Sequence, residues 1–240
     1  MTEPATRPER EALPIAPREL IDRLPLLGRA MLTATKGGAT HERIGRVQKT
    51  AVEGDAALLS GDCHDARIDL GALARVVADR SGKMMDRVLP RLEFQTADGE
   101  TVFSVIALDG IEPFEAALAS TPVGKSLPPK ETPAAGPAEL AEDDPGHAPF
   151  AAARDAGGEV TIALALPGLA QRWRGRVAEI KPAMGFINVM TSDFHLHLRG
   201  GAIASWRREE MEDGLMFSAE DHLGAPTGLT ISGPASSFSA

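Results

Sequence analysis

The stretch Gly185–Trp206, GFINVMTSDFHLHLRGGAIASW, determines how the rest of the chain is interpreted. Residues 186–189 are mostly apolar and predict a strand, and Thr-Ser-Asp at 191–193 has the composition of a turn. Residues 194–198, Phe-His-Leu-His-Leu, alternate between apolar and polar positions, which is the period of a half-buried strand. Gly200-Gly201 predicts a second turn that leads into a third strand. The stretch therefore predicts an antiparallel meander.

A weaker copy of this meander lies earlier in the chain. Gly45–Val47 recurs as Gly175–Val177, 130 positions later (175 minus 45). Two further matches follow in the same order, Ile68–Leu70 with Leu196–Leu198 at an offset of 128 and Leu92–Phe94 with Leu215–Phe217 at an offset of 123. Because the order is kept and the offset decreases slowly, we interpret the chain as a tandem duplication in which turns have shortened.

The duplication also resolves the segment Asp69–Arg80, whose periodicity fits either a helix or two strands joined by a turn. Its counterpart, His197–Arg208, contains a Gly-Gly turn where a helix would run. We therefore predict strand, turn and strand in both copies. The predicted fold class is mainly β with few helices (α+β), built from two tandem antiparallel-sheet repeats.

Proline and charge patterns set the predicted boundaries. Residues 120–150 hold seven prolines and four closely spaced acids, which is typical of a disordered or polyproline-like linker. We predict five segments along the chain: a flexible N-terminal arm at 1–17, a first repeat at 18–119, a Pro-rich acidic linker at 120–158, a second repeat at 159–231 and a tail at 232–240.

Charge and composition exclude several classes of function. The net charge of −9 disfavours a nucleic-acid backbone or an anionic membrane as the main partner, because phosphate binding needs a basic face. The sequence contains no run of 18 apolar residues, so it predicts no membrane-spanning helix. Its first 15 residues lack the apolar core of a secretory signal. The single cysteine, Cys63, forms no internal disulfide. We expect a cytoplasmic protein.

Both halves resemble the HemS/ChuX haem-utilisation family, whose long members are two tandem copies of one β-rich unit. The resemblance rests on Ala39–Gly45, Ile68–Leu70 and Leu92–Phe103 in the first half, and on Gly175–Val189, Asp193–Arg199 and Ala202–Trp206 in the second. The segment Lys-Pro-x-Met-Gly-Phe-Ile-Asn-Val at 181–189, followed by Asp-Phe-x-Leu-His-Leu at 193–198, is its most specific part.

The resemblance implies a haem-binding protein that receives imported haem and either carries it or opens its ring to release iron. Haem or a related tetrapyrrole is then the cofactor or cargo, and a haem importer and a haem-acceptor protein are the implied partners. Homodimer formation is left open. We expect binding or trafficking ahead of an oxygenase-like, haem-degrading activity. The competing hypothesis is a non-catalytic interaction module that kept the fold and lost the pocket.

The family's site residues transfer to few positions of this chain. Its axial histidine starts a His-x-x-Phe segment on a helix, and His147-Ala-Pro-Phe150 is the local match, although Pro149 argues against a helix here. The family's facing arginine falls at Thr35, where the adjacent Lys36 is the cation that would pair with a haem propionate. If the linker folds over the sheet, His147 is the candidate ligand of haem iron. Otherwise it is a solvated linker residue.

Other polar groups have two interpretations each. Arg172, Arg174 and Arg176 would line one face of a strand, where they either receive propionates or form a charged edge. His195 and His197 share a strand face, either as a metal pair without a third ligand nearby in sequence or as the polar side of a half-buried sheet. His41-Glu42 is either an acid/base pair or part of a cross-strand surface pairing.

Overall fold

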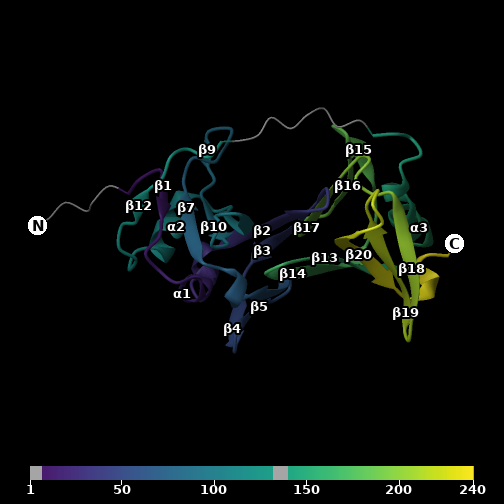
Figure 1. Cartoon of the computed structure of the whole chain (residues 1–240), viewed down its shortest axis with the longest axis horizontal. Coiled ribbons are helices and arrows are strands. Elements are labelled where there is room, and N and C mark those ends of the chain that lie inside the picture. Colours follow the sequence, from purple (N-terminus) through teal and green to yellow (C-terminus); the bar gives the residue numbers. More distant parts are fainter. Residues whose placement is uncertain (1–6, 132–139, 240) are drawn as a thin grey trace, which may run out of the picture. The chain divides into compact units, whose positions relative to one another are not determined.

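The computed structural model describes residues 7–131 and 140–239 of the chain (Figure 1). These residues form two compact units. The first unit comprises 7–33, 44–131 and 167–169, and the second comprises 34–43, 140–166 and 170–239. In these described ranges, every helix is too short or too polar to cross a bilayer.

The first unit consists of antiparallel strands with a few short helices. Its strands are β1 (Arg10–Ala12), β2 (Arg29–Lys36, whose last three residues belong to the second unit), β4 (Lys49–Glu53), β5 (Ala56–Ser60), β6 (Asp65–Asp69), β7 (Arg75–Asp79), β8 (Lys83–Met84), β9 (Arg87–Val88), β10 (Arg91–Gln95), β11 (Thr101–Ala107) and β12 (Lys125–Ser126). Its helices are α1 (Pro17–Ile21), α2 (Ile111–Ala117) and the 3-10 turns η1 (Leu24–Leu27) and η2 (Leu70–Ala72).

Two sets of paired strands build this unit. One runs in the order β12-β1-β7-β10-β11-β2, the other in the order β6-β5-β4, and β8 pairs with β9. Phe94 of β10 stacks on Phe103 of β11, with ring centroids 4.5 Å apart. The helix α2 packs against η1 and inserts the fully buried Phe114. These apolar contacts form the core of the first unit.

The second unit is built in the same way. Its strands are β3 (Ala39–Arg46, whose last three residues belong to the first unit), β13 (Glu159–Leu166), β14 (Leu169–Arg176), β15 (Lys181–Ala183), β16 (Phe186–Met190), β17 (Phe194–Arg199), β18 (Ser205–Met211), β19 (Gly214–Glu220) and β20 (Pro226–Gly233). Its helices are α3 (Ala148–Ala156) and the 3-10 turns η3 (Pro145–His147) and η4 (Ala235–Ser237). The strands pair in the orders β3-β17-β16-β15 and β18-β19-β20-β13-β14.

An aromatic stack lies at the centre of the second unit. The indole of Trp173 lies parallel to the ring of Phe194, with centroids 4.6 Å apart and planes at 10°. The imidazole of His41 contacts the same Phe194 ring at 4.8 Å. Gly175 is required by this packing, because a Cβ atom there would lie 2.3 Å from the Trp173 ring. The glycine of the repeated Gly-Arg-Val motif therefore makes room for a neighbouring side chain.

The predicted fold class is confirmed, and so is the tandem duplication. The strands β2 and β13 have equal lengths and start 130 positions apart (159 minus 29), and so do β3 and β14 (169 minus 39). Val47 and Val177 follow β3 and β14 directly, and both are buried. The segment at 69–80 forms the end of β6, the short turn η2 and β7, as predicted. Each copy thus repeats the same order of strands.

Two of the predicted matches between the copies are displaced by two residues. Ala57 lies opposite Ile68 in the hairpin β5–β6, and Ile187 lies opposite Leu198 in the hairpin β16–β17. Ile68 therefore corresponds to Leu198 at an offset of 130 (198 minus 68), and its predicted match with Leu196 is wrong.

The third match contains the same displacement. The equivalent strands β2 and β13 serve as the starting points. Strand pairing leads from β2 through β11 to β10, and from β13 through β20 to β19. By this route Glu93 corresponds to Ser218, 125 positions later (218 minus 93), and not to Met216. Side chains alternate along a strand with a period of two, so a pattern of apolar residues still fits after a shift of two residues. Strand pairing removes that ambiguity.

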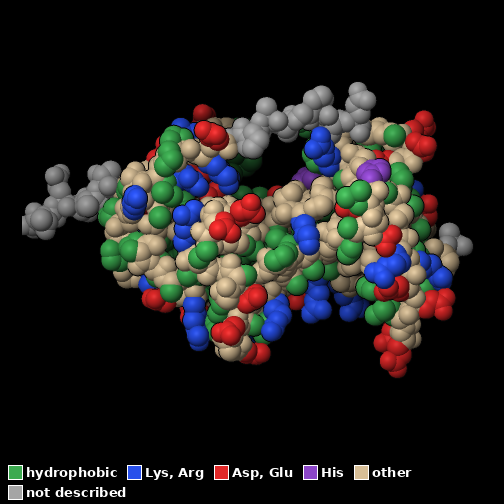
Figure 2. Space-filling model, viewed as in Figure 1, with side chains coloured by type: hydrophobic (Ala, Val, Ile, Leu, Met, Phe, Trp, Pro, Cys, Tyr) green, Lys and Arg blue, Asp and Glu red, His purple; other side chains and the backbone are tan. Residues whose placement is uncertain are grey.

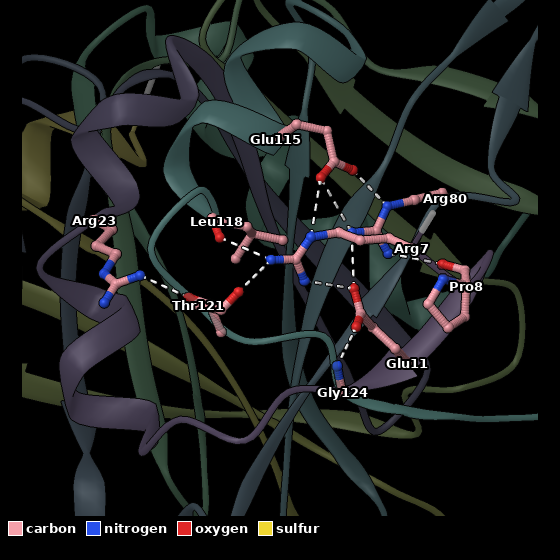
Figure 3. A network of polar contacts seen from close by, with 9 residues as sticks. All are labelled: Arg7, Pro8, Glu11, Arg23, Arg80, Glu115, Leu118, Thr121 and Gly124. Carbon is pink, nitrogen blue, oxygen red and sulfur yellow. Dashed lines mark hydrogen bonds and ion pairs between the residues drawn. The ribbon is translucent and has the colours of Figure 1, made fainter. Parts of the chain in front are cut away.

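The predicted flexible arm is wrong for residues 7–17. Strand β1 lies between β7 and β12, and its fully buried Glu11 is held by cations (Figure 3). Arg7 and Arg80 pair with this carboxylate at 3.0 and 2.9 Å, and the Gly124 N–H donates to it at 2.6 Å. Burial alone would raise the pKa of Glu11, but the Gly124 hydrogen bond and the two guanidinium groups lower it on balance. The charges that suggested a solvated arm are neutralised inside the unit.

The predicted tail at 232–240 also differs from the structure as far as residue 239. Strand β20 continues to Gly233, and η4 follows it. The Ser237 hydroxyl is buried and donates a hydrogen bond to the Glu159 carbonyl oxygen at 2.8 Å. Small residues such as serine and alanine give little hydrophobic signal, so their packing was not predicted from composition.

Candidate haem site around His147 and a histidine-carboxylate cluster

The segment that leads into α3 is attached to the strands of the second unit. Asp144 is buried, and its two carboxylate oxygens accept hydrogen bonds from the N–H groups of Gly146 and Gly201, at 2.8 and 2.7 Å. The indole N–H of Trp206 donates to the Pro145 carbonyl at 3.0 Å. A side chain at Gly146 would meet Leu198 on β17. The described end of the predicted linker thus folds over the sheet, which was the condition for His147 to serve as a ligand.

The expectation that Pro149 excludes a helix is wrong. Helix α3 begins at Ala148, so Pro149 occupies its first turn, where the backbone N–H groups have no partner within the helix. Phe150 is fully buried and meets the Trp206 ring edge-on at 5.6 Å. Gly157 ends the helix in a left-handed conformation. His147 therefore stands at the start of a helix after all, in a His-x-x-Phe arrangement.

A cavity of about 260 Å³ opens beside His147. It is lined by Leu140, Ala141, Glu142, Asp144, His147, Pro182 and Ile187. The His147 imidazole is half-buried, and it forms no hydrogen bond to the described part of the chain. A neutral imidazole in this position keeps a nitrogen lone pair for a ligand. The cavity thus combines one candidate ligand atom with an aliphatic floor formed by β15 and β16.

The acidic groups of this cavity were not anticipated. Glu142 and Asp144 line it, and the lining residues include no cation. Asp144 also borders a second cavity of about 370 Å³, on the side of Gly201 and His222. In the sequence, Asp144 is one acid within a proline-rich run, and only its position two residues before a glycine hints at a turn-forming role.

The predicted cations lie elsewhere in the second unit. Arg172, Arg174 and Arg176 project from the exposed face of β14, with the period of two that was predicted. Arg174 pairs with Glu159 at 3.1 Å. Lys36 is half-buried at the end of β2, and its side chain passes beside Gly228. The four cations are not among the residues that line the His147 cavity.

His41 and Glu42 do not form an acid/base pair, and only Glu42 takes part in the expected cross-strand surface pairing. Neighbouring residues of a strand point to opposite faces, so the two side chains diverge. His41 is fully buried, and its Nε2 lies 3.1 Å from the Ile162 carbonyl oxygen. Burial lowers the pKa of His41 to about 3, with a smaller lowering by Arg43 and opposing effects of the Ile162 hydrogen bond and of Glu42. The surface pairing predicted for His41 is therefore wrong.

Glu42 instead meets the two histidines of β17. The strands β3 and β17 are antiparallel neighbours, with Glu42 directly opposite His195 and with Thr40 opposite His197. One ligand atom from each of Glu42, His195 and His197 lies within 4.8 Å of the other two. The pair of histidines on one strand face was predicted. The third ligand was missed because it comes from a strand about 150 residues earlier, and only the strand pairing brings it close.

On the face of the molecule drawn in Figure 2, both Lys and Arg side chains and Asp and Glu side chains are exposed. This mixture agrees with the net charge of −9.

The repeated strands, with the short helix α3 directly after His147, define a fold class of tandem β-rich repeats. Neither a protein-family model nor a curated protein sequence matches the chain. Solved structures do match. ChuS, a haem oxygenase of E. coli, is 18% identical with a TM-score of 0.74, over 94% of this chain and 83% of ChuS. The haem-bound form of PhuS, a haem-binding protein of Pseudomonas aeruginosa, is 19% identical with a TM-score of 0.73, over 95% of this chain and 83% of PhuS.

The chain therefore has the ChuS and PhuS fold. The resemblance inferred from the sequence motifs is confirmed at the level of fold, including the tandem arrangement. At this identity, the likeness defines the architecture, and the chemistry has to be argued from the residues of this chain.

Proposed function

We propose that this protein binds haem through His147 and carries it within the cytoplasm, between a haem importer and an acceptor protein. The observation that carries the proposal is the position of His147 directly before α3, beside a cavity with an aliphatic floor. The fold adds support, because ChuS is a haem oxygenase and PhuS is a haem-binding protein. When bound, haem supplies an iron atom that takes an imidazole nitrogen as an axial ligand.

The residues present fit one face of a haem. His147 offers an uncommitted imidazole, and Pro182 and Ile187 offer apolar surface to the porphyrin. Glu142 and Asp144 are acids, so the propionates would point away from the cavity toward solvent or toward cations outside it. Lys36, Arg172, Arg174 and Arg176 are our candidates for those cations. Arg176 projects from the exposed face of β14, which makes it the simplest of the four to test.

The size of the cavity favours carriage over ring opening. At about 260 Å³ it is smaller than the roughly 300–1,000 Å³ of typical ligand pockets, so a haem would be only partly covered. Partial cover suits release to an acceptor. Controlled oxygen chemistry requires a porphyrin that is held still, with a pocket that sets the polarity around the iron. We therefore place degradation second.

A titration with haem tests the binding proposal. We expect a saturable shift of the Soret band at about one haem per chain, and a changed spectrum with weaker binding in His147→Ala. His222→Ala is the matched control, because His222 borders the neighbouring cavity and not that of His147. No saturable shift would favour the pocketless interaction module. An unchanged spectrum in His147→Ala would mean that another residue is the axial ligand of the haem iron. His195 and His197 would then be substituted next.

A second measurement separates carriage from degradation. The haem complex is incubated with a reductant in air, with catalase present to remove peroxide. We expect the Soret band to persist and the haem to pass to an apo-acceptor such as apomyoglobin. A bile-pigment product whose formation is slowed by His147→Ala would instead make the protein a haem-degrading enzyme. For the propionates, Arg176→Glu should weaken haem binding, and unchanged affinity would remove the arginine row from the site.

A further inference from the structure

The cluster of Glu42, His195 and His197 has the geometry of a metal site. His195 Nδ1 lies 3.4 Å from Glu42 Oε2, and His197 Nε2 lies 3.7 Å from the same oxygen. Ligand atoms placed about 2.1 Å from a tetrahedral Zn²⁺ are about 3.4 Å apart. Two of the three separations are therefore already close to those of a metal-bound set, and the third is at most 4.8 Å.

A further hydrogen bond fixes the orientation of His197. Its Nδ1–H donates to the Asn188 side-chain oxygen at 2.6 Å. The Asn188 amide is fixed in turn, because its NH₂ group donates to the Lys181 carbonyl oxygen at 2.8 Å. With the proton on Nδ1, the lone pair of the neutral ring is on Nε2, the atom that faces Glu42. Histidine ligands of metals are commonly held by such a partner on the other ring nitrogen.

The two histidines converge on one carboxylate oxygen. His195 Nδ1 and His197 Nε2 both point toward Glu42 Oε2, from neighbouring positions on one face of β17. A divalent cation between the three ligand atoms would be attracted by the carboxylate charge and would be bound by both ring nitrogens.

Exposure also favours the metal. The side chains of Glu42, His195 and His197 are 14, 25 and 31% exposed, so solvent reaches part of the cluster. Three protein ligands with open positions are typical of zinc or iron(II) centres that have two histidines and one carboxylate. The cluster also lies on the opposite face of β16 from the His147 cavity, since Asn188 and Ile187 are strand neighbours.

We propose that Glu42, His195 and His197 bind a divalent first-row transition-metal ion such as Zn²⁺ or Fe²⁺. Asn188 acts as a positioning residue through His197. The proposal does not rest on haem binding, because the two sites have no residue in common.

Calorimetric titration of the full chain with Zn²⁺ tests this proposal, on protein that is chelator-treated and carries no histidine tag. We expect about one Zn²⁺ per chain at neutral pH and a loss of affinity of at least tenfold in Glu42→Gln and in His197→Ala. Asn188→Ala should weaken binding roughly 10- to 100-fold, as loss of such a partner does elsewhere, and Asn188→Asp should restore it. His222→Ala is the matched control and should bind like the parent.

Circular dichroism identifies any variant that fails to fold. Glu42→Gln is nearly isosteric and keeps the test valid if His197→Ala does not fold. Absence of Zn²⁺ binding by the parent overturns the proposal, as does equal affinity in Glu42→Gln. A third opposing result is an NMR titration in which the ring signals of His195 and His197 do not respond to Zn²⁺.

Discussion

Protonation of His41 should make the stability of this protein depend steeply on pH below neutrality. Its ring is fully buried against Phe194 and donates one hydrogen bond to the Ile162 carbonyl. The other nitrogen, Nδ1, is buried and has no hydrogen-bond partner among the described residues. A proton added there would place a charge in the core with no acceptor, which is why burial lowers the pKa of His41 to about 3 from 6.5.

The sign and size of the effect follow from linkage. Because the folded-state pKa is lowered, the unfolded chain binds more protons between pH 6.5 and 3, and the folded state loses stability as pH falls through that window. The cost is about 1.4 kcal/mol per pH unit below 6.5. Going from pH 7.5 to pH 5.0 should therefore remove about 2 kcal/mol of unfolding free energy through His41 alone.

Urea unfolding at pH 7.5, 6.0 and 5.0 measures this effect, with a chelator present so that metal binding does not contribute. The comparison is between the parent and His41→Gln, which cannot be protonated and keeps a side-chain N–H for the Ile162 carbonyl. Other titrating groups cancel in the difference, so the variant should lose about 2 kcal/mol less than the parent over this range. Equal pH dependence in both proteins, within about 0.5 kcal/mol, would refute the argument. His222→Gln, at an exposed histidine, should behave like the parent.

Two further outcomes are expected from buried carboxylates. Glu11→Ala should destabilise the first unit by about 3 kcal/mol in chemical unfolding, because it leaves Arg7 and Arg80 without their shared buried partner, whereas the exposed Glu112→Ala should change little. Because the pKa of Glu11 is lowered in the folded state, its ionised carboxylate stabilises the folded protein above pH 4.5, and this stabilisation is lost as pH falls through the folded-state pKa. The prediction is contradicted if the parent loses no more stability in acid than Glu11→Gln does. Asp144→Ala should release the segment before α3, raise hydrogen exchange at Gly146 and Gly201 and weaken haem binding, whereas the exposed Asp143→Ala should leave both unchanged.

Strand periodicity carried most of the fold prediction. The alternation at 194–198 predicted the hairpin of β16 and β17 correctly, and the repeated Gly-Arg-Val motif located equivalent strands. The predicted meander is wrong in its third strand, because β18 pairs with β19 and not with β17. These signals depend on residues that are close together in the sequence, so a single sequence is enough to detect them. Register is not local, and apolar patterns shifted by two residues look alike, which is why two of the predicted matches were displaced.

The candidate site was harder to predict because its parts come from distant segments. His147 was found through a short motif, but the helix behind it was rejected because Pro149 was judged as an interior residue rather than a first-turn residue. Nothing near His195 in sequence points to Glu42, which reaches it only through the pairing of β3 with β17. The buried Glu11 was missed for the same reason, since its neutralising partner Arg80 lies far along the chain.

The pairing of β3 with β17 has a consequence for the history of this chain. β3 belongs to the first repeat and β17 to the second, so neither repeat completes its own hydrogen bonding along that edge. An ancestor with a single repeat would have left both edges open, and exposed edges promote association. Two identical copies pairing through these strands would have closed them, and gene fusion would then have joined the two into one chain. On this view the present protein is a homodimer made covalent, and fusion freed each half to diverge. Among the residues that the structure describes, the second half alone places a histidine directly before an α-helix, and the junction of β3 with β17 alone gathers two histidines and a glutamate.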